Sequence, residues 1–233
     1  MADNERCDVA VWDVSGGLLG ETRRQLRNTL RRDGPRIAIE TGDWLQKRIA
    51  IAWPQRAIAS HAPSIAEALA ALVAAHRPER LVVVGPATAI DRSLAVGSVL
   101  IADEVVSSHG AERLTLPAIA TADLPSGVVG VGQLAVAETG ARVTTDWAGV
   151  AAEAITDLGV DAVLVTVVTA RANGVLAEPP RSRRPTASRQ AGRLLGKLFK
   201  GDWSMHSNDA ASSAVAGAIR ALLGSPHRDS PSR

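Results

Sequence analysis

Asp146 and Trp147 are the residues whose types and position most suggest binding chemistry. They stand where a polar turn runs directly into an alanine-rich stretch, Thr144–Ile155. A helix that begins beside the end of a sheet is a common place for an α/β protein to hold a small ligand. Asp146 would be a ligand-binding acid or the N-cap of this helix, and we favour the cap. Trp147 would stack on a flat heterocycle or fill space in the core, and the sequence does not separate the two.

Few other side chains suggest chemistry. Thr88 and Thr169 carry hydroxyl groups that a ligand could use, but threonine at a strand end is more often a strand former. The segment Ser15-Gly16-Gly17 resembles half of a phosphate loop and lacks both of the common glycine patterns. The five histidines show no metal-ligand spacing, and Cys7 has no signature around it. We expect no metal site, no cofactor and a buried or inert thiol.

Apolar runs must form the elements that position these residues. Leu81–Val84 and Ala162–Thr169 have no polar alternation, which is typical of strands buried on both faces of a sheet. We expect these two strands to be neighbours or near-neighbours in one sheet. Shorter runs predict further strands at Val9–Trp12, Arg36–Glu40, Arg48–Trp53, Ser98–Ala102 and Gly127–Val131.

Helical patterns alternate with these strands. They are predicted after Gly17 to about Arg32, in a basic stretch, and over residues 63–76, 147–158 and 209–223. Thr41-Gly42-Asp43 is predicted to be a turn. The alternation predicts an α/β fold, a three-layer αβα sandwich with a mixed, largely parallel central sheet.

The distribution of charge predicts the domain organisation. From Arg171 to Lys200 the chain has eight lysines and arginines and a single acid. A helix at Arg189–Lys200 would contact an acidic partner or leave its charges in water, and we favour the second. We expect residues 1–171 to form the α/β core, 172–186 a flexible basic linker or loop, 187–224 C-terminal helices packing on the core, and 225–233 a disordered tail.

Three segments in order carry a family resemblance. Val82–Ile90 with Leu94–Val105 is similar to a strand that ends in Gly-x-Ala-Gly-Gly and continues through Val-Gly-Asp into another strand. Thr144–Ile155 stands where the same family has Asp-Met-Glu, and Ala162–Ala170 matches its strand ending in Arg-x-Ile-Ser-Asp. The chain thus resembles the nucleoside phosphorylase superfamily over roughly residues 36–171. The nucleosidase branch, which includes methylthioadenosine/S-adenosylhomocysteine nucleosidase, is the most similar.

The resemblance implies a nucleoside-phosphorylase-like fold with a cleft at the strand ends for a nucleoside or purine-like small molecule. The residues that would line this cleft are Gly85, Ala87, Thr88, Asp146, Trp147, Ala148 and Thr169.

The acidic residues of the family are missing at the matching positions. Ala148 replaces the glutamate that holds the ribose hydroxyls, and Ala170 replaces the aspartate that protonates the leaving base. No acid stands at the matching place after the first strand, because Asp13 is displaced. Val83 and Pro86 occupy the family's phosphate-binding positions. The catalytic residues are therefore unknown, and whether the chain is an enzyme stays open.

Two functions remain open at this stage. One is a catalytically weak or inactive relative in purine nucleoside or adenosyl-metabolite metabolism; if active, it would be an N-ribosyl hydrolase or phosphorylase. The other is a non-catalytic interaction or structural protein whose basic C-terminal helix contacts an acidic partner. The single cysteine and the absence of a long apolar run predict a cytoplasmic protein with no membrane span. We also expect a homo-oligomer and no nucleic-acid partner.

Overall fold

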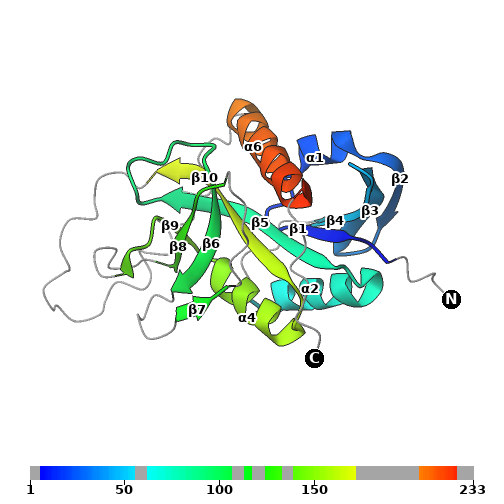
Figure 1. The fold of residues 1–233 in the computed structure, drawn as a ribbon, viewed down its shortest axis with the longest axis horizontal. Coiled ribbons are helices and arrows are strands. Elements are labelled where there is room, and N and C mark those ends of the chain that lie inside the picture. Colours follow the sequence, from blue (N-terminus) through cyan, green and yellow to red (C-terminus); the bar gives the residue numbers. More distant parts are fainter. Residues whose placement is uncertain are drawn as a thin grey trace, which may run out of the picture.

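The computed structural model of the 233-residue chain has helices on both faces of one mixed sheet (Figure 1). It describes residues 6–55, 62–106, 113–116, 124–132, 139–171 and 205–224. The expected α/β sandwich with a mixed sheet is confirmed. The predicted linker at 172–186, the basic helix Arg189–Lys200 and the tail at 225–233 lie outside the described residues.

Four parallel strands form the centre of the sheet, in the order β4 (Lys47–Pro54), β1 (Val9–Asp13), β5 (Arg80–Ala89) and β10 (Ala162–Arg171). The predicted pairing of the two long apolar runs is confirmed, because Leu81 to Val84 lie opposite Ala162 to Val165. All residues in both of these segments are at most 2% exposed. Such continuous apolar sequence requires a protein layer on each face of the strand.

β5 also belongs to a closed ring of strands. β10 pairs with β6 (Val99–Val106), β6 with β8 (Ser126–Val131), β8 with β9 (Val143–Thr145), and β9 with the end of β5. A short strand, β7 (Arg113–Thr115), adds to β6 outside the ring. The ring brings the ends of β5 and β10 to the start of the helix that follows β9.

The helices divide into two layers. In Figure 1, α2 (Ala62–His76) and α4 (Ala148–Leu158) lie below the sheet, while α1 (Gly20–Gln25) and α6 (Met205–Gly224) lie above it. One apolar core contains Leu69 of α2 and Ile155 of α4, and the other contains Ile219 of α6. No helix in the described part of the chain is long and apolar enough to cross a membrane.

Two predictions near the N-terminus are wrong. The basic helix expected to reach about Arg32 ends at Gln25, and the next residues form an edge strand, β2 (Arg27–Asp33). Pairing with β3 (Ile37–Trp44) overrides the helical propensity of this arginine-rich stretch. The residues predicted as a turn, Thr41-Gly42-Asp43, lie inside β3. The chain instead turns at Leu45-Gln46, which have positive φ angles of 52° and 63°.

Candidate functional site

The strand-end segments that the family geometry groups together do meet in this fold. Thr88, near the end of β5, lies opposite Thr144 of β9 on one side and Ala170 of β10 on the other. Ala89 lies opposite Val143 in the same ladder. Residues from three distant parts of the sequence therefore share one end of the sheet, directly beside the first turn of α4.

Trp147 fills the space beside β5. Its side chain is 1% exposed, and its indole Nε1 donates a hydrogen bond to the carbonyl oxygen of Pro86 at 2.8 Å. The ring lies so close to Gly85 that a β-carbon at that position would overlap it. Glycine at position 85 therefore permits the indole to pack against the backbone of the strand. Of the two roles that the sequence left open, packing in the core is the one seen in the structure.

The start of α4 corrects one prediction. The N-cap residue is Trp147, and Asp146 is exposed and makes no capping hydrogen bond. The backbone amide of Ala148 instead donates to Thr145 Oγ1 at 3.1 Å. Thr145 is only 7% exposed, so the first turn of α4 is held from the buried side. The N-cap role of Asp146 is therefore wrong, and Thr145 is the residue that sequence reasoning missed.

Small and backbone-bound groups occupy the remaining positions. Ala148, where the family resemblance implies a ribose-binding glutamate, is 0% exposed, and Ala87 is 4% exposed. Thr169 Oγ1 donates to the carbonyl oxygen of Ala87 at 3.4 Å. Thr88 is partly buried and Ala170 is exposed. The hydroxyl of Thr169 thus joins β10 to β5.

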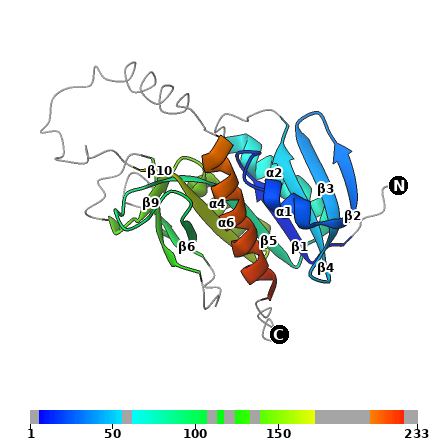
Figure 2. The same cartoon turned by 90° about the horizontal axis from the view of Figure 1, so that it is seen from above.

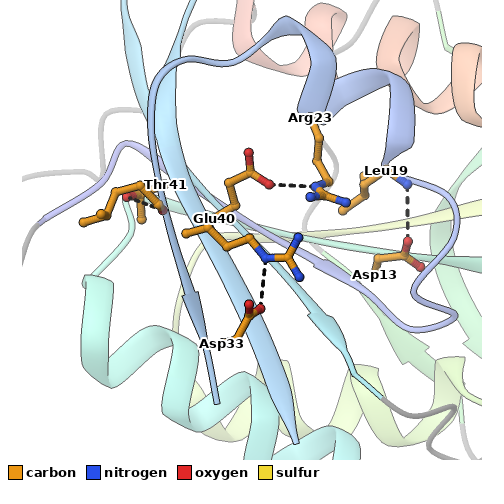
Figure 3. A network of polar contacts seen from close by, with 8 residues as sticks. Asp13, Leu19, Arg23, Asp33, Glu40 and Thr41 are labelled. Atoms are coloured by element: carbon orange, nitrogen blue, oxygen red, sulfur yellow. Dashed lines mark hydrogen bonds and ion pairs between the residues drawn. The ribbon is translucent and has the colours of Figure 1, made fainter. Parts of the chain in front are cut away.

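Asp13 is a buried carboxylate in the loop after β1, 1% exposed. Its Oδ1 accepts hydrogen bonds from the Ser15 amide, the Ser15 hydroxyl and the Gly16 amide, and its Oδ2 accepts from the amides of Leu18 and Leu19. Figure 3 shows the bond to Leu19. An aspartate two residues before a Ser-Gly-Gly sequence is a signal for this kind of turn, because its carboxylate can bind amides further along the chain.

This carboxylate is committed to its own loop. Burial raises the pKa of Asp13 above its ordinary value, while the hydrogen bonds from the Ser15 hydroxyl and from the backbone amides act in the opposite direction. Five donors already surround its two oxygens. Within the described residues, no hydrogen bond joins Asp13 to the exposed Asp146. These two carboxylates, among the residues that the structure describes, therefore do not form a cooperating pair.

Other chemistry-bearing groups do not gather at this place. Among the residues that the structure describes, no cluster of three or more histidine, cysteine, aspartate or glutamate side chains could hold a metal ion. Cys7, two residues before β1, is 2% exposed, and burial raises the pKa of its thiol to about 12. Trp12 of β1 has an indole Nε1 that is buried without a hydrogen-bond partner. Two buried indoles, of Trp12 and Trp147, belong to the core between the sheet, α2 and α4.

Comparison with known proteins identifies the relatives of this fold. The sequence profile described as "Phosphorylase superfamily" matches residues 20–196. No curated protein matches the chain.

Solved structures that resemble the chain are nucleosidases. The 5'-methylthioadenosine nucleosidase of Arabidopsis thaliana superposes with a TM-score of 0.68 at 14% identity, over 97% of this chain and 100% of that one. The methylthioadenosine/S-adenosylhomocysteine nucleosidase of Neisseria meningitidis, with methylthio-immucillin-A, gives 0.63 at 16% identity, covering 92% and 99%. The S-adenosylhomocysteine nucleosidase of Streptococcus pyogenes, with 5-methylthiotubericidin, gives 0.63 at 12% identity, covering 93% and 98%. At these identities the similarity establishes the fold.

Proposed function

The chain belongs to the phosphorylase superfamily, and we propose that it is a nucleosidase-like protein with little or no catalytic power. Its ligand would be a purine nucleoside or an adenosyl metabolite. This ligand class is supported by the similar structures from Neisseria meningitidis and Streptococcus pyogenes, which hold methylthio-immucillin-A and 5-methylthiotubericidin. The site residues of this proposal are Gly85, Ala87, Thr88, Asp146, Trp147, Ala148 and Thr169.

The observation that carries the loss of catalysis is the packing of Trp147 against Gly85 beside a fully buried Ala148. Cleavage of an N-ribosyl bond needs a group that protonates the leaving base and a group that gains interaction as positive charge develops on the ribose. Alanine at positions 148 and 170 supplies neither group. Removal of one general acid typically slows a reaction by about two to four orders of magnitude.

A rate measurement tests this proposal. Release of adenine from methylthioadenosine and from S-adenosylhomocysteine is followed with the Neisseria meningitidis nucleosidase as positive control. We expect the chain to be at least about a thousandfold slower. Residual turnover could come from a contaminating enzyme. The Trp147→Phe variant, purified in the same way, controls for this, because a changed rate in the variant shows that the turnover belongs to the chain. Turnover comparable to the control enzyme would contradict the proposal.

Ligand binding is tested separately from turnover. A ligand that binds the folded chain raises its melting temperature in proportion to the logarithm of ligand concentration above Kd. Melts with adenine, methylthioadenosine and S-adenosylhomocysteine should therefore show whether binding has survived the loss of chemistry. If none of the three ligands shifts the melting temperature, the ligand class proposed here is wrong.

The second candidate is a non-catalytic interaction protein that uses the same fold. The filling of the strand-end space by the Trp147 side chain favours it, because a buried indole leaves less room for a ligand. The acidic partner expected for helix Arg189–Lys200 would belong to this alternative. Absence of both turnover and ligand response would leave this function standing.

A further inference from the structure

One edge of the described sheet is formed by strand β2. β2 forms one end of the strand order and pairs only with β3 among the described strands (Figure 2). All seven residues of β2 are exposed. Within the described part of the chain, no strand pairs with the amide and carbonyl groups on its outer side, as at other open sheet edges.

The positive charge of this edge rests on two of its arginines. Residues 22–36 contain six arginines, and four of them pair with acids: Arg23 with Glu40, Arg24 with Glu21, Arg31 with Asp33 and Arg36 with Glu67. Arg27 and Arg32 make no ion pair with any described residue, and both are exposed. Among the described residues, the unpaired charge of this edge thus lies on β2 itself, and a second copy of β2 would be repelled from it.

A bulge places two arginines and a leucine on one face of β2. Arg27 lies opposite Asp43 and Leu30 lies opposite Thr41, with a register shift between them. Because Asp43 and Thr41 are two residues apart on β3, Arg27 and Leu30 point to the same face despite their odd spacing. Arg32, opposite Ile39, continues this series. Leu30 is 47% exposed, so this face of β2 presents an exposed apolar side chain between two arginines.

The opposite face of β2 is already engaged. Arg31 forms an ion pair with Asp33 at 2.9 Å, next to the pair that Arg23 of α1 forms with Glu40 at 2.7 Å (Figure 3). The guanidinium groups of Arg23 and Arg31 lie 4.1 and 5.4 Å from the ring centre of Trp53. Base stacking is the usual grip on single-stranded nucleic acid, and this indole is occupied by cations.

From this arrangement we infer that the β2 edge is a docking site for an extended acidic peptide segment, which adds to the sheet as a further strand. Main-chain hydrogen bonds to the open edge supply binding, and alternate side chains of the peptide supply specificity. The segment has an acid, an apolar residue and an acid at alternate positions, matching Arg27, Leu30 and Arg32. This surface is distinct from the strand-end region and does not depend on the proposed nucleoside function.

The probe is a fluorescent peptide of seven residues, the length of β2, with aspartate second and sixth, valine fourth and threonine elsewhere. Anisotropy should show saturable binding that weakens with salt. The double variant Arg27→Glu/Arg32→Glu should weaken binding at least about tenfold. Arg24→Glu/Arg36→Glu makes the same change in net charge on two exposed arginines outside β2, which pair with Glu21 and Glu67, and should weaken binding less than about threefold. Hydrogen exchange of residues 27–33 should slow when the peptide binds, because strand addition protects outward-facing amides.

Each alternative has an outcome that overturns the inference. Absence of binding would mean that the arginines only protect the edge from self-association. Equal binding of a scrambled peptide, or unchanged exchange in β2, would mean attraction without strand addition. Displacement of the peptide by oligothymidylate of equal charge at lower concentration would identify the surface as a nucleic-acid site. Equal losses in the two arginine variants would show that only net charge matters.

Discussion

Ala148 is the residue on which the catalytic question turns. It is 0% exposed and belongs to the core with Trp147, so no water-filled space adjoins its side chain within the described residues. Ala170, the second position where the family has an acid, is exposed. The two alanines therefore differ in what a carboxylate would meet, although the family resemblance implies an acid at both positions.

The double substitution Ala148→Glu/Ala170→Asp should destabilise the fold rather than restore a site. A glutamate at position 148 buries an unpaired charge, which costs about 3–5 kcal/mol, whereas Ala170→Asp alone should stay within about 0.5 kcal/mol. Thermal melts of the two single variants and the double variant, with and without methylthioadenosine, measure this. An unchanged melting temperature together with stabilisation by the ligand would instead mean that the space at Ala148 is an open ligand site.

Helix α4 shows how a neighbouring residue can take over an expected role. The amide of Ala148 in its first turn donates to the hydroxyl oxygen of Thr145, although aspartate is the more favoured capping residue type. Thr145 is the last residue of β9, so the strand fixes its side chain towards the helix. The cap therefore depends on the ladder that joins β9 to β5 and β8, which is not visible in the local sequence.

Substitutions of Thr145 and Asp146 should show which of the two side chains caps α4. Thr145→Val keeps the shape and removes the hydroxyl, and should cost about 1 kcal/mol. Thr145→Ser keeps the hydroxyl and should preserve this bond, while Asp146→Ala should stay within about 0.5 kcal/mol. Urea unfolding followed by circular dichroism gives the three values. A larger loss for Asp146→Ala than for Thr145→Val would return the cap to the aspartate.

The elements that the sequence predicted are those with an unambiguous pattern. Leu81–Val84 and Ala162–Thr169 are apolar at every position but two, so both their type and their burial could be predicted. β2 could not, because arginine is compatible with an exposed helix and its strand form exists only through pairing with β3. The turn at Leu45-Gln46 contains no glycine or asparagine, so its left-handed residues gave no signal.

The candidate site, too, could be predicted from the sequence only in part. The meeting of the segments around Thr88 follows from strand order, which the family resemblance implied. The role of Trp147 depends on its close contact with Gly85, which lies more than sixty positions away along the chain. A local sequence pattern cannot predict a contact between residues so far apart. Asp13 had a local signal, an aspartate two residues before Ser-Gly-Gly, and its carboxylate accepts hydrogen bonds from the amides of Leu18 and Leu19 just before α1.

At the scale of the molecule, β5 joins two structures that would otherwise be separate. Its first half pairs with β1 and β10 in the open sheet, and its end pairs with β9 to close the ring. On the α6 side, the buried Arg80 at the start of β5 bonds to Asp161 at 2.9 Å and to the carbonyl oxygen of Leu222 at 3.2 Å. One strand thus connects the ring, the open sheet and the last described helix.

The ring and the open sheet should therefore unfold as one cooperative unit. Val83 is 0% exposed in the centre of β5, and Val83→Ala should cost about 2 kcal/mol through the cavity that it leaves. Under native-state hydrogen exchange, the slowest amides of β8, in the ring, and of β4, in the open sheet, should both lose this same free energy of opening. Leu30→Ala, on the exposed edge strand, should change neither. A loss in β8 without a loss in β4, or the reverse, would mean that β5 is a boundary between two independently stable parts and not the strand that unites them.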